Sequence, residues 1–208
     1  PNSDKEIDKY LKEGVVVSLT RIEPPLHPDG PEKILLDYGI EPEEFKEDEL
    51  LQTVENIQSG KDGILYGPLA LNQDTSEGIF APWAIMKSDW DYIGGHDPIF
   101  APQSKEDSDI FNRFHLAGYK FVQVCKCLVY HMTCRGSRFK DGAIRNPDGQ
   151  VFMKNRESDE WLKQNQKSTR EFIRKWGHFV KHDTMMKPIV PPKYSVGFVV
   201  ENLSLIHI

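Results

Sequence analysis

Between residues 78 and 138 the sequence alternates between strand-like and helix-like segments, and this alternation limits the fold more than any other feature. A short apolar run over 78–86 comes first, followed by a short helix that ends in a di-glycine turn. A second helix over about 105–117 and an apolar strand over 119–131 complete the series. Strands that alternate with helices predict an α/β fold, in which chemistry usually lies beyond the ends of the strands.

The rest of the chain extends this pattern. A β-branched run from Val15 to Leu19 predicts a buried strand. Further helices are predicted over residues 4–12, 42–57 and 157–176, and a last strand over 194–200. Segments rich in proline, glycine or polar residues predict loops over 24–31, 61–77 and 136–156.

Apolar side chains mark the faces that two of these helices are expected to bury. In the helix over 105–117 they are Ile110, Phe111, Phe114 and Leu116. In the last helix they are Trp161, Leu162, Phe172, Ile173 and Trp176.

Composition and charge limit the class of protein. With 208 residues, 38% hydrophobic and 28% charged, the chain predicts one ordered domain or little more. The net charge of -6 argues against a nucleic-acid binder, because such domains usually carry a basic excess. No apolar run is long enough to cross a bilayer, and no signal peptide is visible. The three cysteines lie between residues 125 and 134, which favours a cytoplasmic protein over a secreted disulfide scaffold.

An acidic cluster (Glu106, Asp107 and Asp109) opens the helix over 105–117. Acidic residues in a first helical turn complement the helix dipole, and this needs no function. Alternatively, one of the carboxylates is a general base. Repulsion between adjacent carboxylates raises the pKa of one of them and suits it to accept a proton.

His131 ends the predicted strand over 119–131 and precedes a basic loop with Arg135 and Arg138. A lone histidine is more often structural than a ligand. In this grouping, however, the imidazole suits a divalent metal and the guanidinium groups suit the oxygens of a diphosphate.

The turn Gly94-Gly95-His96-Asp97 has two interpretations. It is either a simple helix stop or a loop where the backbone closely approaches a ligand. Trp83, before the turn, could stack on a sugar ring, although core packing is the more common use of tryptophan.

Taken in order, these motifs resemble the C-terminal half of a family 2-like glycosyltransferase with a GT-A fold, of phage or environmental type. The motifs that carry the resemblance are Gly94-Gly95-His96-Asp97, Glu106-Asp107-x-Asp109 with Arg113, Gly118-Tyr119, and His131 before the basic loop. They lie within residues 78–140, and the blocks 20–25 and 172–177 look similar to uncharacterised members of the group. The resemblance implies a Rossmann-like mixed sheet with flanking helices. It also implies an inverting transfer of a sugar from a nucleotide-diphosphate sugar to a hydroxyl of a glycan, a protein or another acceptor.

The resemblance assigns roles to individual residues. Asp107 would deprotonate the acceptor hydroxyl, which then attacks the anomeric carbon, while Glu106 and Asp109 would position the acceptor or orient the base. His131 would contact a divalent metal, Mn²⁺ or Mg²⁺, or the diphosphate. Arg135 and Arg138 would offset charge on the leaving diphosphate. The residues that would border the substrates are Trp83, Gly94, Gly95, His96 and Asp97.

The start of the chain departs from the family pattern. Family members open with a nucleotide-binding βαβ half and an Asp-x-Asp motif for the metal, and neither precedes residue 15 here. The triplet Asp107-Ser108-Asp109 opens a helix and is assigned to the acceptor side. We therefore expect the nucleotide-binding half, with the main metal ligands, to lie upstream of Pro1. This chain alone is then expected to bind donor poorly and to turn over little.

The expected organisation is an acceptor-side catalytic half over residues 1–182 and a C-terminal extension over 183–202. Residues 203–208 match the translation of a sequencing adapter, so native sequence is expected to end near Asn202.

Two other functions remain open from the sequence. One is a zinc-stabilised binding module without enzymatic activity, built on Cys125, Cys127, His131 and Cys134. Their spacing, C-x-C-x3-H-x2-C, lacks the usual C-x2-C knuckle, and buried free thiols are the simpler interpretation. The other is a metal-dependent phosphoesterase that uses the acidic cluster and His131. Its carboxylates would have to converge on one metal, although they point in different directions around one helical turn.

Overall fold

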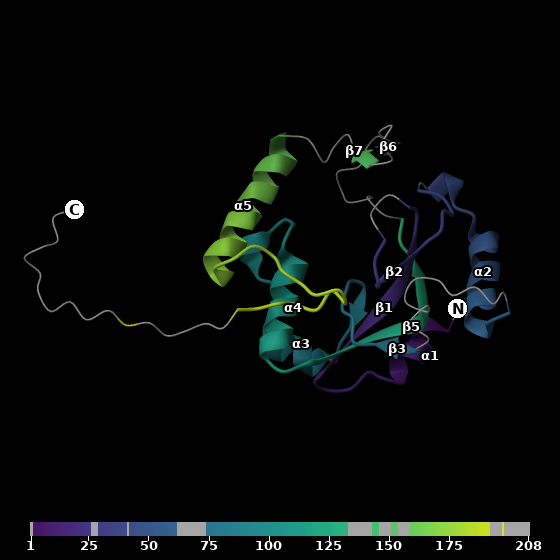
Figure 1. Cartoon of the computed structure of the whole chain (residues 1–208), viewed down its shortest axis with the longest axis horizontal. Coiled ribbons are helices and arrows are strands. Elements are labelled where there is room, and N and C mark those ends of the chain that lie inside the picture. The colour runs from purple at the N-terminus through teal and green to yellow at the C-terminus, as the bar shows by residue number, and fades with distance from the viewer. Residues whose placement is uncertain are drawn as a thin grey trace, which may run out of the picture.

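Strand β1 (Val15–Glu23) forms the centre of the fold, and all nine of its residues are buried. A continuous buried run of this kind requires protein on both faces of the strand. β1 pairs in parallel with β5 (Lys120–Tyr130) on one side and β2 (Lys33–Leu35) on the other, and antiparallel with β4 (Trp83–Ala84). β3 (Thr75–Ser76) pairs with β5, so the sheet is mixed, as the sequence predicts (Figure 1).

The computed structural model describes most of the chain. The described residues are 2–25, 29–40, 42–61, 74–132, 143–145, 151–153, 159–191 and 197. For residues 143–145, 151–153 and 159–161 the description covers the backbone alone.

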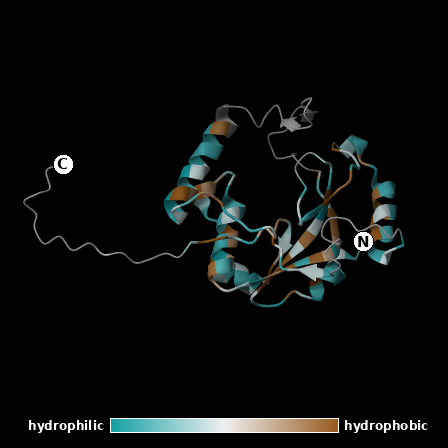
Figure 2. Cartoon of the chain, viewed as in Figure 1, coloured by the Kyte–Doolittle hydropathy of each residue, from teal (hydrophilic) through white to brown (hydrophobic). Residues whose placement is uncertain are grey.

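Helices cover both faces of the sheet (Figure 1). On one face lie α1 (Ser3–Asp8) and α2 (Glu47–Ser59), and on the other lie α3 (Lys87–Ile93) and α4 (Glu106–Leu116). The long helix α5 (Asp159–Trp176) packs beside α4 on the short η3 helix (Pro98–Phe100). Figure 2 shows hydrophobic residues along the central strands and mostly hydrophilic residues on the outer sides of the helices. The fold is therefore α/β, as the sequence predicts.

Alternate residues of β1 supply the two cores next to this sheet. Val15, Val17 and Leu19 pack with the segment of α1, whereas Val16 packs with Ile110 and Phe114 of α4. This period of two is the geometry of a strand whose successive side chains point to opposite faces.

A bulge in β5 changes this alternation. Leu19 pairs with Val124, but the next residue of β1, Thr20, pairs with Leu128, so residues 125–127 have no partner in β1. Beyond this point Ile22 packs with α2, on the same face of the sheet as α1. Arg21 consequently points to the opposite face, where it lies over the ring of Phe80. Bulges often re-aim side chains next to functional sites.

The bulge is held by groups from three neighbouring segments. The amide of Cys125 donates to Asp74 O, Gln58 Nε2 donates to Lys126 O, and Cys127 Sγ donates to Ser3 O. Its conformation is therefore fixed by α1, α2 and the residue before β3 together.

Several predicted boundaries are wrong. The strand predicted over 15–19 continues to Glu23, because its last three residues pair with β2. The strand predicted over 78–86 shrinks to the two residues of β4, which pair with Val17 and Ser18 of β1. The acidic helix predicted over 42–57 divides into a 3-10 turn, η1 (Pro42–Glu44), and α2.

The predicted loop over 136–156 contains an antiparallel hairpin of β6 (Ala143–Arg145) and β7 (Val151–Met153). The predicted loop over 61–77 contains β3 at its end. Of the strand predicted over 194–200, every residue except Gly197 lies outside the described residues.

Two of the side chains predicted to face inward are exposed. Leu116 is 57% exposed, because it lies two residues, or about 200°, around the helix from the buried Phe114. Leu162 is 40% exposed and lies in the first turn of α5. Ile110, Phe111 and Phe114 of α4 are buried, as are Phe172 and Trp176 of α5, so these parts of the prediction are confirmed.

Candidate functional site

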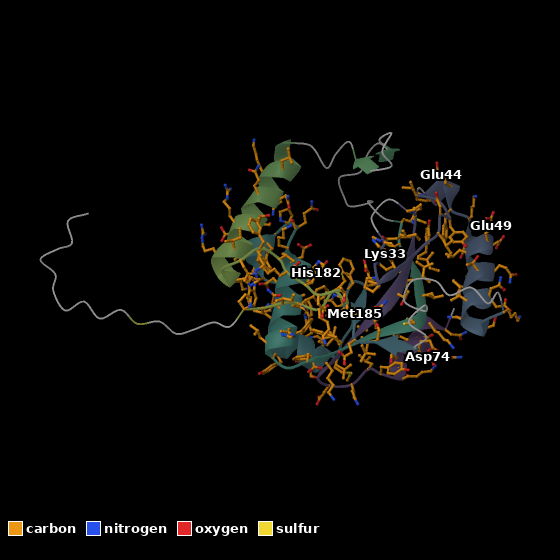
Figure 3. All side chains as sticks on the ribbon, viewed as in Figure 1. Lys33, Glu44, Glu49, Asp74, His182 and Met185 are labelled. Carbon is orange, nitrogen blue, oxygen red and sulfur yellow. The ribbon has the colours of Figure 1, made fainter. Side chains whose placement is uncertain are left out.

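A pocket of about 440 Å³ lies beside the N-terminal end of α4. One wall comes from α4 and the residues just before it, and the other comes from the segment 180–188 that follows α5. Figure 3 labels His182 and Met185 on this segment, between α4 and the sheet. The lining residues are Phe80, Ser104, Lys105, Glu106, Asp107, Ser108, Phe111, Asn112, Val180, Lys181, His182, Met186 and Pro188.

The segment 180–188 is held in place by its own hydrogen bonds. The side chain of Asp183 accepts from the amides of Met185 and Lys187. The carbonyl of Met185 accepts from the amide of Ile79, and Lys187 Nζ lies 2.9 Å from Glu77 Oε2. These contacts fix the outer wall of the pocket to the polypeptide that leads into β4.

Asp107 lies in the first turn of α4 and lines the pocket. Burial raises the pKa of its carboxyl, while electrostatic interactions with His96 and Arg21 act in the opposite direction. An aspartate in such an environment holds a proton better than an exposed aspartate does. This property is suited to a general base.

Glu106, the neighbour of Asp107, also lines the pocket. Burial raises the pKa of Glu106, and the charge of Asp107 raises it further. The repulsion between adjacent carboxylates that the sequence predicts is therefore present, but burial is the larger cause.

Asp109 is completely buried and does not line the pocket. Its Oδ2 accepts from Arg113 Nε at 2.9 Å, and its Oδ1 accepts from Trp176 Nε1 at 2.9 Å and lies 2.7 Å from Lys175 Nζ. These contacts connect α4 to α5. A direct contact between Asp109 and a bound molecule would require these partners to move.

The di-glycine turn ends α3. Gly94 has φ +82° and Gly95 φ +66°, and the amide of Gly94 donates to the carbonyls of Trp90 and Asp91. A Cβ on Gly95 would lie 2.9 Å from Trp90 Cζ2, so no larger residue fits without movement. Arg113 holds the turn against α4, because Nη1 donates to Ile93 O at 2.8 Å and Nη2 to Gly95 O at 2.6 Å.

The residues around this turn form a layer behind the pocket. None of Trp83, Gly94, Gly95, His96 and Asp97 lines it. The ring centroids of Trp83 and Trp90 are 5.8 Å apart, and the exposed His96 packs edge-on against both rings. Trp83 also lies 5.5 Å from Phe114, as expected for core packing.

Asp97 begins the η3 helix. Its Oδ1 accepts from the amide of Ile99, and its Oδ2 lies 2.7 Å from Lys175 Nζ. The hydrogen bond from Lys175 lowers the pKa of Asp97. Lys175 thereby joins Asp97 to Asp109.

A group of buried charges lies at the carboxyl ends of the parallel strands, and most of its members lie outside the motifs that predicted the site. Glu23 Oε1 lies 3.0 Å from Lys33 Nζ, and Glu23 Oε2 lies 3.4 Å from Arg21 Nη1. Arg21 Nη2 also donates to Glu32 Oε1 at 3.1 Å. Each of these four side chains is less than 10% exposed. Figure 3 labels Lys33 at this end of the sheet.

His131 joins this group through Glu23. Its Nδ1 lies 2.7 Å from Glu23 Oε2, and its side chain is 44% exposed. Burial alone would raise the pKa of Glu23, but the hydrogen bond with His131 and the charges of Arg21 and Lys33 lower it to about 2. Because Nδ1 is engaged, Nε2 is the ring nitrogen that can face a metal. A carboxylate on the other ring nitrogen is the usual support for a histidine ligand, so His131 fits this role.

One contact connects the buried charges to the pocket. The guanidinium of Arg21 lies 4.2 Å from the ring centroid of Phe80, which lines the pocket. Arg21 also contributes to the electrostatic environment of Asp107. Arg135 and Arg138 lie outside the described residues.

The cysteines give no support to the zinc interpretation. Cys125 and Cys127 are completely buried, and burial raises the pKa of Cys125 to about 11. Cys134 lies outside the described residues, and among the described ones no group of three or more His, Cys, Asp and Glu side chains could hold a metal.

No helix in the described part of the chain has both the length and the apolar character to span a bilayer. Comparisons of the chain with models of protein families, with curated proteins and with solved structures found no match.

Proposed function

We propose that this chain carries the acceptor side of an inverting glycosyltransferase of the GT-A type, with Asp107 as the general base. The observation that supports this most is the position of Asp107 in a pocket, with a pKa raised by burial. A base must reach its substrate and must hold a proton in the transition state, and this environment favours both.

The reaction requires few groups on the acceptor side. Asp107 accepts the proton of the acceptor hydroxyl as its oxygen forms a bond to the anomeric carbon of the donor sugar. The bond between that carbon and the diphosphate oxygen breaks, and its electron pair leaves with the diphosphate. The guanidinium of Arg21 lowers the pKa of Asp107 and so favours its ionised form, as does the interaction with His96, although burial has the larger effect.

The leaving diphosphate needs positive charge at the other end of the site. A divalent metal, Mn²⁺ or Mg²⁺, would supply that charge when bound. Of the described residues, His131 is the one we expect to contact it, with its ring held by Glu23. Arg135 and Arg138 remain candidates from the sequence alone for the same charge.

The two other functions have weaker support. A phosphoesterase would need carboxylates that converge on a metal, whereas Asp109 points into the contact between α4 and α5. A zinc module would need ligands that converge, whereas no group of three or more His, Cys, Asp and Glu side chains among the described residues could hold a metal.

The test is an assay of nucleoside diphosphate release from a panel of nucleotide sugars, with and without hydroxyl acceptors. It uses the product of the complete reading frame of the source gene. We expect release that depends on the acceptor, and a decrease of about 10²–10⁴-fold in Asp107→Asn. Asp91→Asn is the matched control, because Asp91 is exposed on α3 and pairs only with Lys87 among the described side chains. Release of nucleoside monophosphate and sugar phosphate, equally fast without an acceptor, would favour the phosphoesterase.

A further inference from the structure

The general base of the proposed reaction lies in a segment with an unusual backbone. The segment 97–109 runs from the start of η3 into the first turn of α4 and carries Glu106 and Asp107. Just before α4, Ser104 has φ +81° and Lys105 has φ +74°. Residues other than glycine rarely adopt this left-handed region, and strained residues of this kind persist only where the surroundings hold them. The contacts that hold this segment are therefore relevant to the site.

Helix α5 holds the middle of the segment by its main chain. Gln164 Nε2 lies 3.1 Å from Ala101 O and 3.0 Å from Gln103 O. The completely buried Ser168 donates from Oγ to Gln103 O at 3.1 Å. Backbone carbonyls outside a regular helix or sheet need such partners where water is excluded. Two side chains of α5 therefore fix the course of the chain between η3 and α4.

Lys175, near the end of α5, holds both ends of the segment. Its Nζ lies 2.7 Å from Asp97 Oδ2 and 2.7 Å from Asp109 Oδ1. Asp109 is completely buried and lies two residues after Asp107 in the same helical turn. A rotation of this turn about the helix axis would carry both carboxylates with it. The contact that fixes Asp109 therefore also fixes the direction of Asp107.

These contacts come from one side of a regular helix. Ser168 lies four residues and Lys175 eleven residues after Gln164, which are about one and three turns of an α-helix. Asn165, next to Gln164, accepts from Ser104 Oγ at 2.9 Å. A helix of 18 residues thus contacts the segment that carries the base at several points along its length. Groups supported by a regular element are placed more precisely than groups held by a loop alone.

We propose that α5 positions the general base, with Lys175 as the positioning residue that fixes the first turn of α4 through Asp109. This inference rests on the proposed function, since it concerns the base of the same reaction. Lys175 does not line the pocket, so it acts on catalysis through Asp97 and Asp109. We expect its loss to misplace Asp107 without removing a group that contacts the acceptor.

The experiment measures kcat and the KM for the acceptor in the product of the complete reading frame, at a temperature where every variant is folded. Lys175→Met should lower kcat by about 10²-fold, because a misplacement of about 1 Å can cost this much. It should change KM by less than about threefold, because binding of the acceptor in the ground state is kept. Lys175→Arg should recover most of kcat, since a guanidinium can also pair with two carboxylates.

Two controls separate positioning from a loss of stability. Arg174→Met removes the neighbouring cation of α5, which pairs with Glu171 of the same helix, and should keep the wild-type kcat. Val54→Ala weakens the core beside α2 and should lower the melting temperature but keep kcat. The melting temperatures of all variants are measured alongside.

The outcomes separate this inference from the proposed function. Acceptor-dependent release that continues unchanged in Lys175→Met would overturn the inference and leave the proposed function standing. An equal fall of kcat in Val54→Ala would also overturn the inference, because lost stability would then explain both variants. No acceptor-dependent release by the wild type would overturn both. If Lys175→Met fails to fold, Gln164→Leu decides the question, and an unchanged kcat in that variant would contradict the inference.

Discussion

Glu23 and His131 are 108 residues apart in the chain, and a 2.7 Å contact joins Oε2 of the one to Nδ1 of the other. They meet because β1 and β5 run parallel and end at the same edge of the sheet. The amide of His131 also donates to Ile22 O, which extends the pairing by one residue beyond β5. The position and orientation of this histidine are therefore properties of the sheet.

The low pKa of Glu23 predicts a loss of stability in acid. Its folded-state pKa of about 2 lies below the ordinary value of 4.5. The ionised carboxylate therefore stabilises the fold fully above pH 4.5, and this contribution is lost as the pH falls toward 2. The difference corresponds to about 3 kcal/mol in the free energy of unfolding. Urea denaturation at a series of pH values between 6 and 2 measures it.

Glu23→Gln is the control for this titration. The variant should unfold about 3–5 kcal/mol more easily at pH 6, because Arg21 and Lys33 keep their buried charges without this partner. Between pH 4.5 and 2 it should then lose less stability than the wild type. Equal losses in the two proteins would show that other carboxylates cause the acid sensitivity.

Asp109→Asn tests whether this residue connects α4 to α5. The neutral amide cannot pair with Lys175 and Arg113 as the carboxylate does, although both partners are partly exposed. We expect a loss of about 2–3 kcal/mol in the free energy of unfolding. The matched variant Asp91→Asn removes an exposed pair and should cost no more than about 0.5 kcal/mol. If the two variants are equally stable, Asp109 is available for another role.

The two glycines of the turn after α3 should differ in their tolerance of alanine. Both have positive φ, which costs a residue with a Cβ about 1–2 kcal/mol. A Cβ on Gly94 would meet nothing within 4 Å, whereas one on Gly95 would press on Trp90. Gly95→Ala should therefore lower the free energy of unfolding by about 1–3 kcal/mol more than Gly94→Ala does, which is the usual cost of overpacking a core. The total effect of Gly95→Ala would then be roughly twice that of Gly94→Ala. Thermal unfolding of the two variants side by side measures the difference, and equal melting temperatures would contradict it.

Local patterns in the sequence were sufficient to predict much of this fold. The apolar spacing of Ile110 and Phe114 and the glycine at position 118 predicted α4 nearly to the residue, because these signals lie within the helix itself. Glu106 and Asp107 were found in the same way, and both line the pocket.

Contacts between distant residues could not be predicted. Arg21 and Glu23 follow the apolar run of β1, and nothing in that segment shows that a bulge in β5 turns Arg21 toward Phe80. The segment 180–188 also carries no motif, yet it forms a wall of the pocket, because Met185 and Lys187 attach it to remote residues. Charged residues placed two apart at the end of a buried strand are the one signal that could have directed attention to Arg21 and Glu23.

The buried cysteines give a last prediction, on reactivity. Burial raises the pKa of Cys125 from 9.0 to about 11 and also raises that of Cys127. At pH 8 the native state should therefore contain about a hundredfold less Cys125 thiolate than the unfolded chain, and the thiolate is the reactive form. In a Cys134→Ser variant, a thiol-reactive dye should label the native protein at least this much more slowly than the protein in urea. Zinc content of the purified wild type is measured alongside. Rapid labelling in the native state would contradict the protection by burial. One zinc per chain that is lost in Cys125→Ala would show that this thiol is a ligand and would restore the zinc module as a function for the chain.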